Sequence, residues 1–229
     1  MRPFTCSAGP SARLGPTPRR RCAPPFRSVG MPRALLLLAL AFVAGCSGGL
    51  SHTVKESYLK EMSRQGELWV FDAENEIVVA LDKLDEARDM LEHIRRRIKE
   101  AQKGVEKAEK RGNRLGVDVS ESWLAYLESL EEWAEENIDL QRFGIVVARA
   151  SVELAKAQVI NREDLLGGKG FDMRDYQEQY NTLRDEFLAM KKKVDAMRKS
   201  ARKRERKWWK LRGRFVAQTR DFDSGLWID

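Results

Sequence analysis

Proline and cysteine are nearly absent from most of this sequence. All seven prolines lie at or before Pro32, and of the three cysteines only Cys46 lies beyond residue 22. The rest of the chain therefore has no proline to interrupt a long helix, and it cannot form a disulfide within itself. No apolar run reaches the length of about 20 residues that a membrane-spanning helix needs. A disulfide-rich fold and a multispan membrane protein are excluded.

Residues that commonly mark catalysis or metal binding are also scarce. His52 and His93 are the only histidines, and no cysteine lies close enough in sequence to give metal-ligand spacing. The glycine cluster at 167–170 lacks the Ser or Thr that follows Gly-Lys in a phosphate-binding loop. No nucleophile motif is present, and the many carboxylates fall on predicted helix surfaces. We therefore predict that the protein is not an enzyme and binds no metal or other cofactor.

A short apolar segment near the N-terminus carries the most specific signal in the sequence. Arg33 precedes the apolar residues 34–43, and small residues lead from there to Cys46. Ten helical residues span about 15 Å, which is half the thickness of a bilayer core, so the segment fits an export signal and not a membrane span. Its last four residues, Val-Ala-Gly-Cys, resemble the lipobox of bacterial lipoproteins.

The resemblance to bacterial lipoproteins implies cleavage before Cys46, acylation of its sulfur and usually of its new amino group, and anchoring by lipid alone. Two or three acyl chains give a stable anchor, whereas one is marginal. Ser47 implies, by the same resemblance, a location at the outer membrane facing the periplasm. The alternative interpretation is a core helix that ends in a buried cysteine.

The segment before Met31 is rich in Arg, Pro, Gly and Ser and contains no acidic residue. Such a composition buries too little apolar surface to fold. It is either an overlong basic region or the product of a start codon assigned too early. We expect a disordered or mis-annotated extension over 1–30, a signal peptide over 31–45, a lipidated tether over 46–52, a helical domain over 53–219 and a tail over 220–229.

Heptad repeats predict three long helices, over residues 53–111, 119–164 and 172–219. Thr53 with Glu56, Asp118 with Glu121, and Asp172 supply their N-terminal capping residues. The first helix has two rows that recur every seven residues, which are Val70, Ile77, Leu84, Leu91, Ile98 and Val105, and Ala73, Ala80, Ala87, Ile94, Ala101 and Ala108. Short glycine-containing loops separate the helices, so we predict an all-α, elongated, up-down-up antiparallel three-helix coiled-coil bundle.

Charge is segregated along the chain in a way that fits this topology. Residues 118–139 contain eight acidic residues and no Lys or Arg, whereas residues 95–114 and 191–214 are strongly basic. An up-down-up bundle places these three segments side by side at one end, with the acidic strip between two basic ones. We expect the ion pairs to fix register and orientation, because exposed pairs contribute only about 0–1 kcal/mol each.

The basic segment near the C-terminus contains the candidate contact residues. Trp208 falls on the predicted core row and is expected to pack against Trp123 or Trp133, whereas Trp209 is expected to be exposed. The candidate contacts to an anionic partner are Lys207, Trp209, Lys210, Arg212 and Arg214. The alternative is a solvated basic face that balances the acidic first helix. Nucleic acid is not expected as a partner, since an exported protein rarely meets any.

Together these features predict a lipid-anchored structural or interaction protein of the bacterial cell envelope. Its membrane contact is the lipid on Cys46, and its basic end, distal to the anchor, would meet an anionic envelope component or an acidic protein; a homo-oligomer is also compatible. The alternatives are a periplasmic chaperone or carrier and an adaptor subunit of an envelope transport or motility complex. A chaperone would expose apolar surface between its helices, whereas a structural rod would have closed seams.

Overall fold

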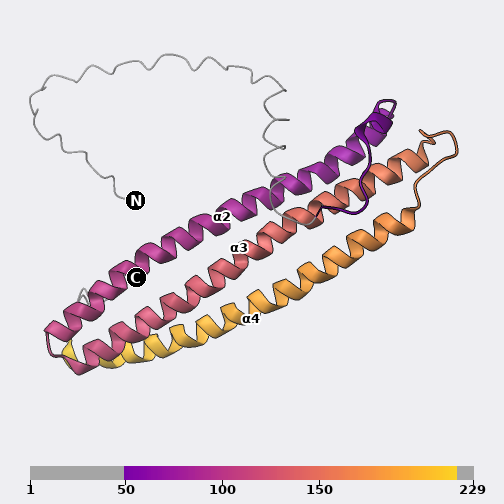
Figure 1. Ribbon diagram of the computed structural model, residues 1–229. Coiled ribbons are helices and arrows are strands. Elements are labelled where there is room, and N and C mark those ends of the chain that lie inside the picture. Colours follow the sequence, from indigo (N-terminus) through magenta and orange to yellow (C-terminus); the bar gives the residue numbers. More distant parts are fainter. Residues whose placement is uncertain (1–48, 221–229) are drawn as a thin grey trace, which may run out of the picture. The chain divides into compact units, whose positions relative to one another are not determined.

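The computed structural model describes residues 49–220, and every regular element in this range is helical. A short 3-10 helix, η1 (Glu56–Leu59), precedes three α-helices, which are α2 (Arg64–Lys110), α3 (Arg114–Arg162) and α4 (Met173–Thr219). Each α-helix has 47 or 49 residues and is about 70 Å long at 1.5 Å per residue. Successive helices run antiparallel (Figure 1), which confirms the predicted all-α three-helix bundle.

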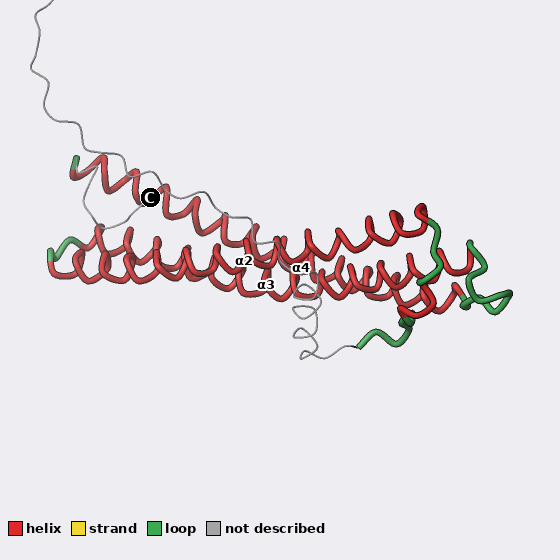
Figure 2. The backbone as a smooth tube through the Cα atoms, turned by 90° about the horizontal axis from the view of Figure 1, so that it is seen from above, coloured by secondary structure: helices red, strands yellow, loops and turns green. Residues whose placement is uncertain are grey.

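The central helix of the bundle is α3. It packs against both α2 and α4, whereas no Cα atom of α2 lies within 8 Å of one in α4. Figure 1 shows α3 between the two outer helices, and Figure 2, the view from above, shows the same three long helices joined by loops. Because α3 serves two seams, it buries residues on two sides, which explains why its apolar pattern is less regular than those of its neighbours.

The seam between α2 and α3 is built on the alanine row predicted from the heptads. Ala87 packs with Ile138 and Ile145 of α3, and Ala73 packs with Val152 and Ala155. Small side chains on one helix allow the larger side chains of the next to interdigitate at short interaxial distance. The predicted core rows of α2 are therefore confirmed as its α3-facing stripe.

At the end where α2 turns into α3, side chains from all three helices share one core. Ile98 of α2, Leu127 of α3 and Trp208 of α4 are members of this cluster, and each is less than a tenth exposed. The turn itself contains Gly112, whose φ of 65° is one that residues with a Cβ rarely adopt. The predicted glycine break between the first two helices is thus correct.

The predicted start of the first helix at residue 53 is wrong. Residues 53–55 are not helical, η1 follows them, and α2 begins only at Arg64. The true N-cap is Ser63, whose Oγ accepts a hydrogen bond from the N–H of Gly66 at 3.1 Å. The Thr53-Glu56 pattern does not form a capping box because the chain at this point is held by other helices, as described below.

The second helix begins earlier than residue 119, the predicted start. Asn113 caps it, accepting a hydrogen bond from the N–H of Gly116 at 3.0 Å, so the helix runs from Arg114. Gly116 is buried in the first turn instead of interrupting the chain. For α4, Asp172 is the N-cap as predicted, and its side chain accepts from the N–H of Arg174 at 2.9 Å.

Glu163 at the end of α3 is tied to the start of α2. The Ser63 hydroxyl donates to one of its carboxylate oxygens at 2.5 Å and the Ser63 backbone N–H donates to the other at 2.8 Å. These two bonds lower the pKa of Glu163 below its ordinary value, and the bond from the hydroxyl has the larger effect. The stabilisation from this contact is therefore present above the unfolded-state pKa and is lost as the pH falls through the lowered pKa of the folded state.

We expect the Ser63→Ala variant to raise the pKa of Glu163, because the larger of the two bonding contributions is removed. A carboxyl NMR titration of Glu163 measures the change directly. Ser63→Thr keeps the hydroxyl and serves as the control, so its Glu163 should titrate as in the unaltered protein. An unchanged pKa in Ser63→Ala would show that the hydroxyl does not bind this carboxylate in solution.

Candidate functional site

The five predicted contact residues lie close to the C-terminal end of α4. Lys207, Lys210 and Arg214 are exposed and form no ion pair within residues 49–220. Trp209 is 50% exposed, and the Arg212 guanidinium carbon lies 4.9 Å from the centroid of its ring. At about 100° per residue, Lys207, Lys210 and Arg214 fall within about 60° of one another on α4, so they form a cationic surface suited to anions. Trp209 and Arg212 lie at least about 100° further around the helix and stack on each other there instead.

Trp208, next to Lys207 in the sequence, is buried against α3, as predicted. Its ring centroid lies 4.3 Å from that of Trp123 on α3, and only 2% of Trp208 is exposed. The alternative partner, Trp133, instead lies under the guanidinium of Arg198, 4.9 Å from the ring centroid. The packing of Trp208 fixes the backbone of α4, so its neighbours Lys207 and Trp209 are held on the outside of a rigid helix.

The predicted acidic strip lies between two basic ones. On one side Arg95 of α2 donates to Glu131 at 2.7 Å and to Glu135 at 2.6 Å, and the bond to Glu131 is the main cause of a raised Arg95 pKa. On the other side Lys193 of α4 contacts Glu136 at 2.7 Å. All these side chains are substantially exposed, so the pairs specify register more than they add stability.

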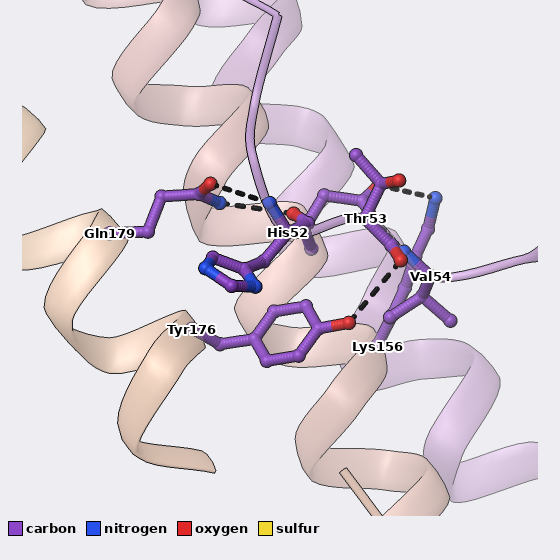
Figure 3. Close-up of polar contacts among 7 residues, drawn as sticks. His52, Thr53, Val54, Lys156, Tyr176 and Gln179 are labelled. Atoms are coloured by element: carbon purple, nitrogen blue, oxygen red, sulfur yellow. Dashed lines mark hydrogen bonds and ion pairs between the residues drawn. The ribbon is translucent and has the colours of Figure 1, made fainter. Parts of the chain in front are cut away.

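Sequence reasoning missed a second feature, at the opposite end of the bundle. Residues 51–54, here called the strap, lie across α3 and α4. The amide of Gln179 on α4 accepts from the His52 N–H at 2.9 Å and donates to the His52 carbonyl at 3.1 Å. The Ser51 hydroxyl also donates to Gln179, at 2.8 Å. The Tyr176 hydroxyl donates to the Thr53 carbonyl at 3.3 Å, and Figure 3 shows this bond together with the two between Gln179 and His52.

The strap is anchored on its C-terminal side by burial as well as by polar contacts. Val54 is 7% exposed and shares a cluster with Leu154, Ala157, Ile160 and Tyr176. The Val54 N–H donates to the Glu153 carboxylate at 2.5 Å, and the same carboxylate pairs with Lys156 at 3.1 Å. Burial raises the pKa of the Tyr176 hydroxyl. No local pattern signals these contacts, because their partners lie about 100 residues or more apart in the sequence.

An exposed apolar stripe lies on the strap-side half of α2. Leu68, Phe71, Val78 and Val79 are each at least half exposed, and helical periodicity places them away from the buried Val70 and Ala73. A groove of about 640 Å³ between η1 and α2 includes Leu68 and Phe71 in its lining. This stripe can bind another apolar surface but offers no group for catalysis.

Within residues 49–220 there is no cluster of His, Cys, Asp and Glu that could hold a metal ion, and no helix is apolar enough over a sufficient length to cross a bilayer. The predicted lipidation site, Cys46, lies outside these residues. Comparisons with family models, curated proteins and solved structures returned no match for this chain.

Proposed function

We propose that this chain is a lipid-anchored structural or interaction protein of the bacterial cell envelope. In this proposal Cys46 carries the lipid, and the helical bundle presents the basic surface of α4 to an anionic envelope component or an acidic protein. The location is the outer membrane, facing the periplasm. The proposal assigns no reaction, cofactor or metal to the chain.

The observation that carries this proposal is the ordered combination of an apolar run, small residues and Cys46. It is supported by the bundle that follows, because three packed helices with exposed charges are suited to holding a surface in place. Lys207, Lys210 and Arg214 form no ion pair within the described residues and so are available to anions. The basic surface lies near one end of the bundle and the strap near the other.

We expect the Cys46→Ala variant to lose its lipid and to leave the membrane fraction. Cells fed a clickable fatty-acid analogue should label the unaltered protein and not the variant, since the thioether sulfur is gone. Cys22→Ala is the matched control and should label normally. Equal labelling of the Cys46→Ala variant and the unaltered protein would refute the anchor, whereas loss of labelling with full retention in the membrane fraction would show a second attachment.

A second candidate function is favoured by the apolar stripe on α2. A chaperone or carrier, or an adaptor that docks a channel, needs exposed apolar surface, and Leu68, Phe71, Val78 and Val79 supply it. No Cα atom of α2 lies within 8 Å of one in α4, although side chains of both helices share a core at the turn between α2 and α3. This candidate predicts that polar substitutions on the stripe abolish binding to a client, whereas the anchored-protein proposal predicts that they leave anchoring unchanged.

A further inference from the structure

The strap determines where the chain leaves the bundle. Its contacts with Gln179 hold His52 on α4, and the chain before it, Gly49 and Leu50, enters a groove of about 500 Å³ between α3 and α4. Phe143 and Val146 line this groove from α3, and Leu183 and Glu186 line it from α4. The N-terminal exit is therefore on the side of the bundle.

The exit point lies well away from the end of the bundle. Glu186 is thirteen residues beyond Met173, where α4 begins, which corresponds to about 20 Å along the helix. Cys46 precedes Gly49 by three residues, and three extended residues reach at most about 11 Å. A lipid on Cys46 would thus hold the flank of the bundle, and not its tip, next to the bilayer.

The same flank of α4 continues into its basic half. Gln179 and Glu186 begin a row with seven-residue spacing whose later members are Lys193, Ser200, Lys207 and Arg214. This row keeps its orientation because a parallel row with the same spacing, Val194, Ala201, Trp208 and Phe215, stays buried throughout. The face that carries the strap therefore leads directly to Lys207 and Arg214.

We propose that the bundle lies side-on against the membrane that holds its lipid, with this row of α4 on anionic phospholipid headgroups. The inference rests on the proposed acylation of Cys46 and names the anionic component of the proposed function as lipid phosphate. Lys207 and Arg214 contact the phosphates. The exit point is surrounded by acidic residues, which are Asp175, Glu178 and Glu186. The lipid holds this acidic half of α4 at the membrane, and Lys207 and Arg214 orient the basic half toward the headgroups.

Two single-cysteine labels distinguish a side-on bundle from an upright one. Ser200→Cys lies on the row, and Arg96→Cys lies on α2; both positions are exposed. They lie at similar heights along the bundle, because Arg95 and Lys193 bind neighbouring carboxylates of α3. Each variant is expressed as full-length chain, purified in its acylated form and labelled with a fluorophore, after mass spectrometry has confirmed the acyl chains on Cys46.

The labelled proteins are placed on vesicles of phosphatidylglycerol and phosphatidylcholine that contain a lipid with a nitroxide headgroup as a short-range quencher. We expect quenching at position 200 to exceed that at position 96 by about threefold or more, and the excess to vanish on phosphatidylcholine alone or at high salt. Equal quenching at the two positions on the anionic vesicles would overturn the side-on arrangement while leaving the anchor intact.

A matched pair of charge reversals tests the residues themselves. In the Ser200→Cys background, Lys207→Glu with Arg214→Glu should abolish the excess quenching. Lys199→Glu with Arg206→Glu makes the same change in net charge at exposed positions of α4 that are next to the row in sequence. This pair should leave most of the excess quenching, because residues 199 and 206 are turned about 100° around the helix from the row. Equal effects of the two pairs would overturn the assignment to this row, and absence of acyl chains on Cys46 would instead refute the anchor on which it rests.

Discussion

Replacing Trp208 with alanine is expected to lower the free energy of unfolding by about 3–5 kcal/mol. Trp208 is 2% exposed and its ring centroid lies 4.3 Å from that of Trp123. The substitution removes this contact and leaves a cavity in the core where all three helices meet. Urea denaturation at constant pH measures the change as a lower midpoint with an unchanged slope.

Two variants serve as controls for this prediction. Trp209→Ala removes a side chain of the same size from the next position, but Trp209 is half exposed, so the loss should stay below about 1 kcal/mol. Trp208→Phe keeps an aromatic ring and removes an indole N–H that has no hydrogen-bond partner within the described residues, so part of the lost packing is offset. Similar losses in Trp208→Ala and Trp209→Ala would contradict the burial of Trp208.

The second large effect is expected at Asn161, which closes the loop between α3 and α4. Its amide donates to the Phe171 carbonyl at 2.8 Å and accepts from the Phe171 N–H at 2.7 Å. Asn161→Ala leaves both backbone groups without their partner, and Phe171 is only partly exposed. We expect a loss of about 2–3 kcal/mol in the free energy of unfolding, since each unpaired group costs about 1 kcal/mol or more.

Asn137→Ala is the matched control on the same helix. Asn137 is also partly buried, but its side chain accepts only from Gln141, one turn away, at 3.1 Å. A contact between side chains of the same helix contributes about 0.2–0.5 kcal/mol, so this variant should remain close to the unaltered protein in thermal and urea unfolding. If Asn161→Ala were no less stable than Asn137→Ala, the loop would not depend on this amide.

The parts of the fold that follow from local pattern were predictable. Apolar residues at seven-residue spacing predicted the core stripe of α2, and the glycine at 112 predicted the first turn correctly. The segregation of charge fits the helix order that the short loops predict, because that order places the acidic segment between the two basic ones. These signals are carried by residues near in sequence, so no tertiary information is required to find them.

The start of α2 was mispredicted because tertiary contacts override local propensity there. Thr53 and Glu56 satisfy the capping-box spacing, but the Thr53 carbonyl accepts from Tyr176 and the Val54 side chain is buried against α3. Gly116 caused the opposite error at the start of α3. A glycine beside a turn favours a helix break, so the helix was predicted to begin at residue 119 and not at Arg114. In the structure Gly116 occupies a buried position in the first turn of α3, where its N–H donates to the Asn113 side chain that caps the helix.

Of the candidate site, the basic residues of α4 were predictable and the strap was not. Lys207, Lys210 and Arg214 stand out in the sequence as a run of one charge, and Trp209 could be placed outside the core from its heptad position alone. The contacts of Gln179 with Ser51 and His52 join residues 127 or 128 positions apart. Neither Gln179 nor His52 belongs to a motif, so only the folded chain reveals their pairing.

The strap also constrains the order of events as the chain is made and folds. Residues 51–54 emerge before any helix, yet their partners Glu153, Tyr176 and Gln179 are among the later residues to be synthesised. The two hairpins can pair from neighbouring segments, whereas the full set of strap contacts must wait until the first turns of α4 have formed. A chain truncated before α4 would keep the contacts of Val54 with α3 but would lose those that Tyr176 and Gln179 make with the strap.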